Sequence, residues 1–380
     1  MRLLIDCSVL SVGGGLQVGL SLINNIAYDK DFEVIIIASN EIDHQIPQAI
    51  KDKVLSYTCL PQCSGLKKIK FNKLIQSIES RYNPDLIFTV FGPSYWRSKQ
   101  KNLQGFALGK MLYPEVRDNY SSKVTMYKEK LTDFLKKYFL KKNSDCFVVE
   151  TEVVKQRMHQ YLSIPLDKIF VVSNSYSPDF EKVIINNNKK VSSDRNKKTI
   201  FIPASFYQHK NLLILPYVAR ELLNLGFSTF TFKFTIPENS TGWSTIMNLS
   251  NKLGVDSHFC TLGHVDNTKI GFEYLNSDLI LCTSLVESST AVFPESFIAK
   301  RPLAVSDRDF AKKLCEDGVL YFDPLNSADI AQTIVTLINN DDLVTELVDK
   351  ASIVLKKNYL SPAEKWQKQK ELLTFLGCEQ

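Results

Sequence analysis

Residues 279–297, LILCTSLVESSTAVFPESF, contain the pattern that decides the fold. The apolar run Leu279–Thr283 is continuous rather than alternating, which is typical of a strand buried on both faces. A short loop follows it, and Pro294 is then a natural first residue of a helix. The segment therefore predicts one strand–loop–helix unit of a parallel sheet.

The same alternation of strand-like runs and amphipathic stretches continues on both sides of this segment. Further runs rich in Ile, Val and Phe occur at Leu3–Val9, Glu33–Ala38, Val54–Leu60, Leu86–Phe91, Gln104–Leu108, Cys146–Glu150, Ile169–Val172, Thr199–Ala204, Thr231–Ile236, His258–Leu262, Leu303–Ser306 and Leu320–Phe322. Alternating strands and helices favour parallel sheets with helices on both faces.

A polar stretch divides this pattern into two halves. Residues 186–198, NNNKKVSSDRNKK, hold one apolar residue in thirteen and cannot contribute much to a core. The 380 residues therefore predict two doubly wound, Rossmann-like α/β domains, residues 1–180 and 181–360, with a C-terminal helix at 361–380 that packs back on the first domain. Ligands of such sheets bind outside the carboxyl ends of the strands, so we expect the site in a cleft between the domains.

Composition and cysteine usage indicate a soluble protein of the cytoplasm. Apolar residues make up 44% and charged residues 23%, which excludes disordered and fibrous classes. The apolar runs are far shorter than the roughly 20 residues that span a bilayer, and Asp6 interrupts the signal-like start. The 8 cysteines are scattered, and Cys59 and Cys63 lack the further ligands of a zinc site. Scattered free thiols favour a reducing compartment.

The positive charge is concentrated in the first half of the chain. The whole chain carries a net charge of +5, and residues 97–142 hold 12 basic and 4 acidic side chains. Within this range, residues 123–142 predict a basic amphipathic helix with Leu131, Phe134, Leu135 and Tyr138 on one face. Such a helix can lie on an anionic membrane, and the alternative is a core face flanked by solvated lysines.

Three glycines, Gly13, Gly14 and Gly15, follow the first strand and open the first helix. They let the backbone approach a ligand closely, and the start of a helix favours anions. The spacing differs from that of a nicotinamide-binding loop. A plain strand-to-helix turn is the alternative.

The second half begins in a similar way. In residues 201–211, FIPASFYQHKN, a strand ends near Ala204 and a helix follows Asn211. Lys210 therefore lies at a helix entrance, where its charge can neutralise a diphosphate. The alternative is an ordinary surface lysine.

Two glutamates follow the strand of the opening segment. Glu287 lies in the loop, and Glu295 lies in the first turn of the helix. Ser288, Ser289 and Thr290 supply backbone N–H groups and hydroxyls to the same space. Carboxylates accept paired hydrogen bonds from vicinal hydroxyls, so this set suits a ligand with both phosphate and diol groups, such as a nucleotide sugar. A favourable interaction of Glu295 with the helix dipole is the alternative.

Together, the two glutamates with seven residues between them, the HKN turn and the GGG loop resemble glycosyltransferase family 4, the retaining enzymes of GT-B fold. VGGGLQV, FGPSYW with GFA, PASFYQHKN and SDRDF look similar to members from bacterial O-antigen and capsule clusters. The resemblance extends from residue 5 to about 325. It implies an acceptor-binding N-terminal domain and a donor-binding C-terminal domain.

The resemblance also implies roles for single residues. Glu295 would hold the ribose hydroxyls, Glu287 would face the transferred sugar, and Lys210 would contact the diphosphate. The glycine loop, Gly13–Gly15, would approach donor and acceptor, and residues 288–290 would offer N–H groups to phosphate and sugar. Gly263 and the strand before it fall where the family packs the base.

Some positions depart from the family pattern. Ser205 stands where many members carry an arginine, so phosphate neutralisation would depend more on Lys210, aided by His209. Thr290 stands where a glycine is frequent and restricts the loop. No histidine occurs between Val90 and Glu150, so we assign no catalytic histidine.

Asp307 and Asp309 form an Asp-x-Asp pattern with Arg308 between them, but hard cations need several oxygen ligands and DRDF also resembles a helix start. We therefore expect no required metal or other cofactor, and the expected partners are a nucleotide-sugar donor and a glycan or lipid-linked acceptor, without nucleic acid. The expected enzyme is a retaining hexosyltransferase of bacterial surface polysaccharide synthesis, cytoplasmic or peripheral on the inner face of the membrane. A sugar-nucleotide epimerase is the alternative.

Overall fold

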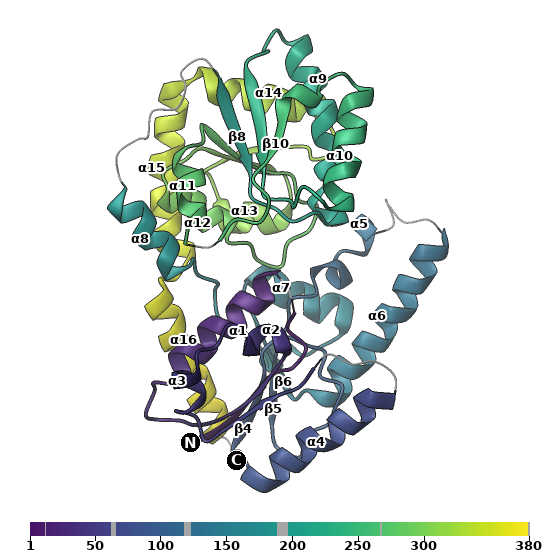
Figure 1. Ribbon diagram of the computed structural model, residues 1–380, viewed down its shortest axis with the longest axis vertical. Helices are drawn as coiled ribbons and strands as arrows, with labels where there is room; N and C mark the ends of the chain where they lie inside the picture. Colours follow the sequence, from purple (N-terminus) through teal and green to yellow (C-terminus); the bar gives the residue numbers. More distant parts are fainter. Residues whose placement is uncertain (12, 62–65, 118–122, 188–196, 267, 379–380) are drawn as a thin grey trace. The chain divides into compact units, whose positions relative to one another are not determined.

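The chain forms two compact units in a computed structural model (Figure 1). Unit 1 consists of Met1–Ser173 with Ala363–Gln380, and unit 2 consists of Asn174–Pro362. The structure describes all residues except 12, 62–65, 118–122, 188–196, 267 and 379–380. Most of the polar stretch 186–198 therefore lies outside the described residues.

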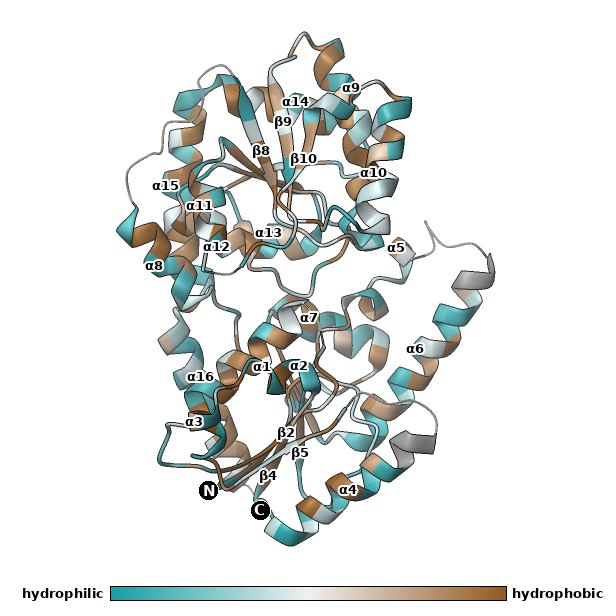
Figure 2. Cartoon of the chain, in the orientation of Figure 1, coloured by the Kyte–Doolittle hydropathy of each residue, from teal (hydrophilic) through white to brown (hydrophobic). Residues whose placement is uncertain are grey.

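Unit 1 contains a seven-stranded sheet in which every neighbouring pair is parallel. In spatial order the strands are β3 (Ser56–Cys59), β2 (Glu33–Ala38), β1 (Arg2–Cys7), β4 (Leu86–Thr89), β5 (Asn102–Gly105), β6 (Cys146–Val149) and β7 (Ile169–Val171). Figure 2 shows the apolar character of β2 and β4, whereas β5 carries the buried polar residues Asn102 and Gln104. The side chains of β2 and β4 are largely buried because helices cover the sheet, as their continuous apolar runs predicted.

Unit 2 contains a six-stranded sheet that is also parallel throughout. In spatial order its strands are β10 (Phe259–Thr261), β9 (Phe230–Phe234), β8 (Lys198–Ile202), β11 (Leu279–Cys282), β12 (Leu303–Ser306) and β13 (Leu320–Phe322). The predicted α/β architecture with two doubly wound sheets is therefore confirmed.

The α-helices follow the strands along the chain. In unit 1 they are α1 (Gly13–Ile26), α2 (Asn40–Asp43), α3 (Gln48–Lys51), α4 (Leu66–Tyr82), α5 (Pro114–Arg117), α6 (Lys123–Asn143), α7 (Glu152–Arg157) and α16 (Pro362–Cys378). In unit 2 they are α8 (Pro178–Asn186), α9 (Leu215–Asn224), α10 (Thr241–Lys252), α11 (Ile270–Leu275), α12 (Val292–Ile298), α13 (Asp309–Cys315), α14 (Ser327–Asn339) and α15 (Asp341–Asn358). Leu373 and Leu376 of α16 belong to the core of unit 1.

Predicted and observed strand ends differ by at most two residues except at β5, and the start of α12 also needs correction. The helix predicted to begin at Pro294 begins at Val292, so Pro294 lies inside the first turn, where its missing N–H costs no helical hydrogen bond. The strand predicted at residues 104–108 lies at Asn102–Gly105 instead. Its register places Gly105 opposite Val148 of β6, and Phe106 continues with one hydrogen bond to that strand.

The order of strands reverses once in each sheet. In unit 1 the chain runs outward from β1 to β3 on one side and from β4 to β7 on the other. In unit 2 the corresponding reversal lies between β8 and β11. Loops leaving the carboxyl ends of such a strand pair diverge, which opens a crevice at that position in doubly wound sheets. The loop after β8 and the loop after β11 are therefore the first place to look for a site in unit 2.

Candidate functional site

The loop after β8 is held in a defined conformation by the loop after β11. It passes through a 3₁₀ turn, Gln208–Lys210, and Asn211 then adopts a left-handed conformation with φ of 56°. Asparagine tolerates this region better than most residues because its amide can bond locally or to nearby backbone. Here Asn211 Nδ2 donates to the carbonyl of Pro324 at 2.7 Å.

Two hydrogen bonds join the loops directly. Thr283 Oγ1 donates to the carbonyl of Lys210 at 2.8 Å, and the backbone N–H of Leu285 donates to the carbonyl of His209 at 2.7 Å. The carbonyl of Lys210 and the carbonyl of the residue before it thus both accept hydrogen bonds from the loop after β11. This arrangement fixes the backbone from which the lysine side chain extends.

Lys210 and Glu287 form a buried ion pair. Lys210 Nζ donates to Glu287 Oε1, and the two side chains are 17% and 8% exposed. Burial alone would lower the pKa of Lys210, but the charge of Glu287, the nearby Cys282 and the hydrogen bond together outweigh it and raise that pKa. Lys210 therefore keeps its positive charge over the whole physiological range of pH.

Glu295 has a different partner. It lies in the first turn of α12, and the hydroxyl of Tyr274 from α11 donates to its Oε2 at 2.8 Å. Burial raises the pKa of Glu295 to about 7, and the hydrogen bond from Tyr274 partly opposes this rise. Tyr274 is fully buried, and burial followed by the charge of Glu295 raises its own pKa. Near neutral pH this carboxyl group is divided between its neutral and ionised forms.

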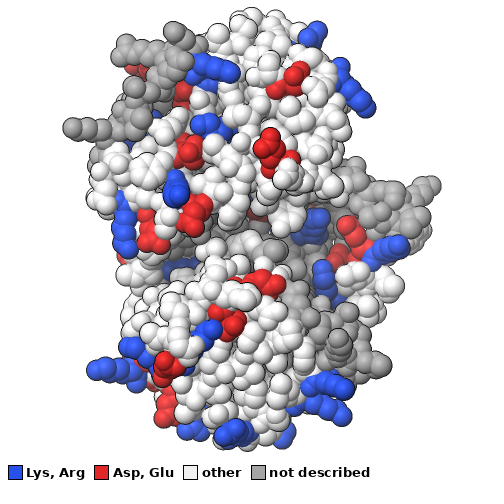
Figure 3. Space-filling model, viewed as in Figure 1, with Lys and Arg blue, Asp and Glu red and all other residues white. Residues whose placement is uncertain are grey.

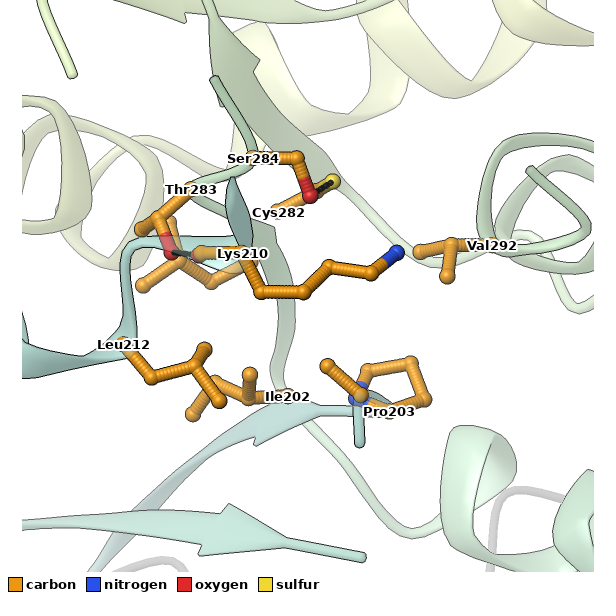
Figure 4. Close-up of a pocket in the computed structure, with 10 residues that line it drawn as sticks. Ile202, Pro203, Lys210, Leu212, Cys282, Thr283, Ser284 and Val292 are labelled. Atoms are coloured by element: carbon orange, nitrogen blue, oxygen red, sulfur yellow. Dashed lines mark hydrogen bonds between the residues drawn. The ribbon is translucent and has the colours of Figure 1, made fainter. Parts of the chain in front are cut away.

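A small cavity lies beside Lys210 at the ends of β8 and β11 (Figure 4). Its walls include Pro203, Lys210, Ser284 and Val292, and Figure 4 shows the lysine side chain extending toward Val292. The space open to the centre of a water molecule is about 10 Å³, close to what one water needs. Val292 precedes Glu295 by three residues, so both lie on the same side of the first turn of α12. The start of α12 and Lys210 are therefore neighbours.

The loop between the two glutamates is only partly accessible. Ser288 and Ser289 are half-buried, whereas Thr290 is buried and its Oγ1 accepts a hydrogen bond from the N–H of Val292 at 3.3 Å. Thr290 therefore caps the chain just before α12. This hydrogen bond restricts the loop, as predicted from a threonine at a position where a glycine is frequent.

The other predicted residues of unit 2 also follow strands at this edge of the sheet. Ser205 is exposed in the loop after β8, and His209 is half-buried with its ring stacked on Tyr207. Gly263 follows β10, which is separated from β8 by β9, and its φ of +70° suits a glycine. No side chain or backbone atom lies within 4 Å of a Cβ built at Gly263, so its surroundings are open.

The predicted glycine loop belongs to unit 1. Gly13 begins α1 with a φ of +67°, and a Cβ at Gly13 or Gly14 would meet no atom within 4 Å. A Cβ at Gly15 would touch the ring of Phe91 at 3.4 Å. The loop follows β1 and Phe91 follows β4, which are the two strands at the reversal of this sheet.

Two residues of the site were not predicted from the sequence. Tyr274 precedes Glu295 by 21 residues, so no local spacing links them, and Thr283 was assigned only to the strand. A threonine directly after an apolar run was the only signal for Thr283. Tyr274 had none, because an aromatic residue in an apolar stretch is normally a core residue.

The Asp-x-Asp pattern has an ordinary structural explanation. Asp307 pairs with Lys312 at 2.7 Å, and Asp309 is the first residue of α13, as the helix-start interpretation predicted. Within the described part of the chain, no group of three or more His, Cys, Asp or Glu side chains is placed to hold a metal ion.

The fold of this chain is that of the GT-B glycosyltransferases. Residues 183–353 match the family model of glycosyl transferases group 1, which spans most of unit 2 and all of its site residues. A search of curated protein sequences finds no significant match. The chain is a glycosyltransferase by this domain, and the prediction of such an enzyme is confirmed.

Solved structures with this fold match nearly the whole chain. A glycosyltransferase from Rickettsia africae is 18% identical with a TM-score of 0.69, covering 100% of this chain and 99% of its own. Anabaena Alr3699/HepE in complex with UDP and glucose is 14% identical with a TM-score of 0.71, covering 98% and 99%. WaaG, a glycosyltransferase involved in lipopolysaccharide biosynthesis, is 10% identical with a TM-score of 0.73, covering 98% and 100%.

These likenesses show the fold, and they do not favour the epimerase alternative. Among the described residues, no helix is both long enough and apolar enough to cross a bilayer.

Proposed function

We propose that this chain is a retaining hexosyltransferase that takes a sugar from a nucleoside diphosphate and adds it to a hydroxyl of a growing, lipid-linked surface polysaccharide of a bacterium. The observation that carries the proposal is the buried pair of Lys210 and Glu287 at the reversal of the unit 2 sheet, beside the helix that bears Glu295. A cation and two carboxyl groups there suit a ligand with both phosphates and hydroxyls.

The donor would bind across this edge of the sheet. Lys210 would face the diphosphate, Glu295 in its ionised form would accept hydrogen bonds from the ribose hydroxyls, and Gly263 would leave room for the base. Alr3699/HepE was solved with UDP and glucose, which supports a nucleotide-sugar donor for a chain of this fold. Ser205, His209, Asn211 and the backbone at Ser288–Thr290 would complete the binding surface.

The reaction requires charge stabilisation more than covalent chemistry. The bond between the anomeric carbon and the diphosphate oxygen breaks, and the acceptor oxygen bonds to that carbon on the same face. The acceptor proton leaves with the diphosphate oxygen. Lys210 would stabilise the negative charge that develops on the diphosphate, and Glu287 would face the positive charge on the sugar ring. Because Lys210 supplies this cation, we propose that no metal is required, so turnover should persist in EDTA.

The pairing of Lys210 with Glu287 has a consequence for binding. A diphosphate that reaches Lys210 competes with Glu287 for the same ammonium group. Binding of the donor would therefore loosen the internal pair and free Glu287 to face the sugar. The pair would thus exist in full only before the donor arrives.

The acceptor would reach the first unit. Gly13–Gly15 lie at the reversal of the unit 1 sheet, with open surroundings at Gly13 and Gly14, and would approach the acceptor. WaaG takes part in lipopolysaccharide biosynthesis, which supports a glycan acceptor. A lipid-linked acceptor would place the enzyme in the cytoplasm, in peripheral contact with the membrane through residues 97–142. Nucleic acid is not proposed, because Figure 3 shows charges of both signs intermixed on the visible face of the described residues.

The proposal is tested with a panel of UDP-, GDP- and TDP-sugars. We expect at least one of them to shift the melting temperature and to be consumed with a suitable acceptor. Lys210→Ala and Glu287→Ala should each abolish most of this turnover, by about 10²–10³-fold. Lys198→Ala is the matched control, because Lys198 pairs with Asp278 at the opposite end of the same strands. Wild-type turnover in both site variants would refute the assignment.

A further inference from the structure

Helix α6 turns a row of large apolar side chains toward solvent. The exposed fractions are 69% for Tyr127, 62% for Leu131, 66% for Phe134, 48% for Leu135 and 48% for Tyr138. At 100° per residue these five side chains share one face about 100° wide. We call these five residues the α6 stripe. Figure 2 shows the mixed apolar and polar character of α6 along its length.

The α6 stripe is exposed although the helix itself is firmly held. Leu140 is 1% exposed, and the ring of Phe139 packs edge-on against Tyr95 with centroids 5.2 Å apart. Lys137 Nζ also donates to the carbonyl of Tyr161 at 2.9 Å. These contacts use other faces of the helix, so they hold α6 on unit 1 while the stripe stays exposed.

Lysines border the α6 stripe. Exposed Lys130 and Lys141 follow one margin and exposed Lys128 follows the other, by their positions around the helix. Lys142 lies at the end of the stripe, where its Nζ donates to the hydroxyl of Tyr138 at 2.7 Å. The acidic residues of this part of α6, Glu129 and Asp133, are half-buried and lie on the opposite side of the helix.

We propose that the α6 stripe docks onto an anionic lipid bilayer, with the helix lying in the plane of the interface. The apolar side chains would enter the boundary between headgroups and acyl chains, and the flexible lysine stems would keep their ammonium groups at the phosphates. Lysines on both margins match the negative surface of such a membrane. The two tyrosines suit the same depth, because each has an apolar ring and a polar hydroxyl.

The charge pattern disfavours the other occupants of such a face. A second copy of the chain would bring lysine margins against lysine margins, with no exposed carboxylate of α6 to neutralise them. A nucleic acid would satisfy the lysines but would leave Leu131, Phe134 and Leu135 against a polar backbone. A bilayer satisfies both kinds of side chain at once.

This inference rests on the proposed function, because it identifies the residues through which the enzyme would reach a membrane-bound acceptor. The binding test itself needs no sugar. The full-length protein is mixed with vesicles of phosphatidylcholine, alone or with phosphatidylglycerol, and the bound fraction is measured by flotation at low and near-physiological salt. We expect binding to the vesicles with phosphatidylglycerol, weakened by salt.

Variants of exposed residues locate the surface. Leu131→Ser/Phe134→Ser should reduce the partition coefficient by about tenfold or more, and Lys128→Glu should reduce it by about fivefold or more. Ile353→Ser and Lys182→Glu are matched controls, because these side chains are 68% and 71% exposed on helices of unit 2. Both controls should bind the vesicles like the wild type.

Several outcomes would overturn the inference. They are absence of wild-type binding to anionic vesicles, equal binding by the stripe variant, and a wild-type dimer that becomes monomeric in Leu131→Ser/Phe134→Ser during sedimentation. Transfer to a soluble acceptor separates this inference from the proposed function, because the stripe variant should retain it. Vesicle binding without turnover of any nucleotide sugar would leave the surface assigned and refute the proposed transferase reaction.

Discussion

Replacing Glu295 by Gln should stabilise unit 2 and abolish tight donor binding at the same time. The carboxyl group of Glu295 accepts a hydrogen bond from the buried Tyr274, and burial raises its pKa from 4.5 to about 7. A raised pKa means that the folded protein binds the proton more tightly than the unfolded chain does. The contribution of this group to stability is therefore complete below pH 4.5 and is lost as the pH rises through 7.

The size of the effect follows from the two pKa values. Proton linkage gives a difference in unfolding free energy between Glu295→Gln and the wild type that is about 2.5 kcal/mol larger at pH 8 than at pH 5. Glutamine keeps the shape of the side chain and can still accept from Tyr274, but it does not titrate. The variant should therefore gain stability at alkaline pH, where the wild type must keep a poorly solvated carboxylate.

The assay must report on unit 2 alone, because a chain with two units need not unfold in one step. Urea-dependent hydrogen exchange of the amides of β11, a strand buried in the middle of the unit 2 sheet, gives that local unfolding free energy at each pH. Glu238→Gln, an exposed change in the same unit, is the control and should give the same difference at pH 5 and pH 8. A Glu295→Gln difference that does not change with pH would refute the reasoning.

The remaining predictions concern the donor site and one strand of unit 1. Wild-type donor affinity, measured by calorimetric titration, should rise about tenfold from pH 6 to pH 8 as Glu295 ionises. In Tyr274→Phe this rise should occur at higher pH, because the lost hydrogen bond had lowered the pKa of Glu295. Lys210→Met should destabilise unit 2 by about 3–5 kcal/mol in urea unfolding, because it leaves Glu287 buried and unpaired. Lys210→Met/Glu287→Gln should recover most of that stability without recovering turnover. Equal stabilities of the single and double variants would contradict this reasoning. Glu287→Gln should bind a nucleoside diphosphate more tightly than the wild type in the same titration, because Lys210 loses its internal partner, and weaker binding would count against the competition between them. Gly105→Ala should destabilise unit 1 by about 3 kcal/mol or more, because its Cβ would lie 1.7 Å from the carbonyl of Val90; an unchanged melting temperature would show that the strand can shift.

Most strands were predictable because they are local apolar runs of the sequence. A parallel strand covered on both faces must be apolar at nearly every position, so Leu279–Cys282 or Glu33–Ala38 is recognisable without knowledge of its neighbours. Strand ends were less certain, since a strand ends where pairing ends, and pairing depends on a neighbour distant in sequence. Helix α8 was missed although Ser177 caps it and Pro178 opens it, a signal that the sequence does contain.

The site was predictable in outline and not in its contacts. Lys210 and Glu287 lie in the loops that leave the two strands at the reversal of strand order. The positions of both residues after predicted strands were sufficient to infer that they lie at this edge of the sheet. The direct pairing of these two residues, 77 positions apart, required the fold. The same is true of Tyr274 with Glu295 and of Asn211 with the carbonyl of Pro324, because each joins elements that meet only in the folded sheet.

The two glutamates have different partners, which indicates different roles in binding the donor. Glu287 faces a full positive charge, whereas the partner that Glu295 has in this structure is a neutral phenol. A buried carboxylate with a cation is stable until something competes for that cation, and a diphosphate is such a competitor. A partly buried carboxyl group with a phenol is held near its neutral form and gains most from a ligand that donates hydrogen bonds, as a ribose diol does. One group therefore responds to the anionic part of the donor and the other to its hydroxyls, so a nucleotide sugar satisfies both where a free phosphate or a free sugar would satisfy only one.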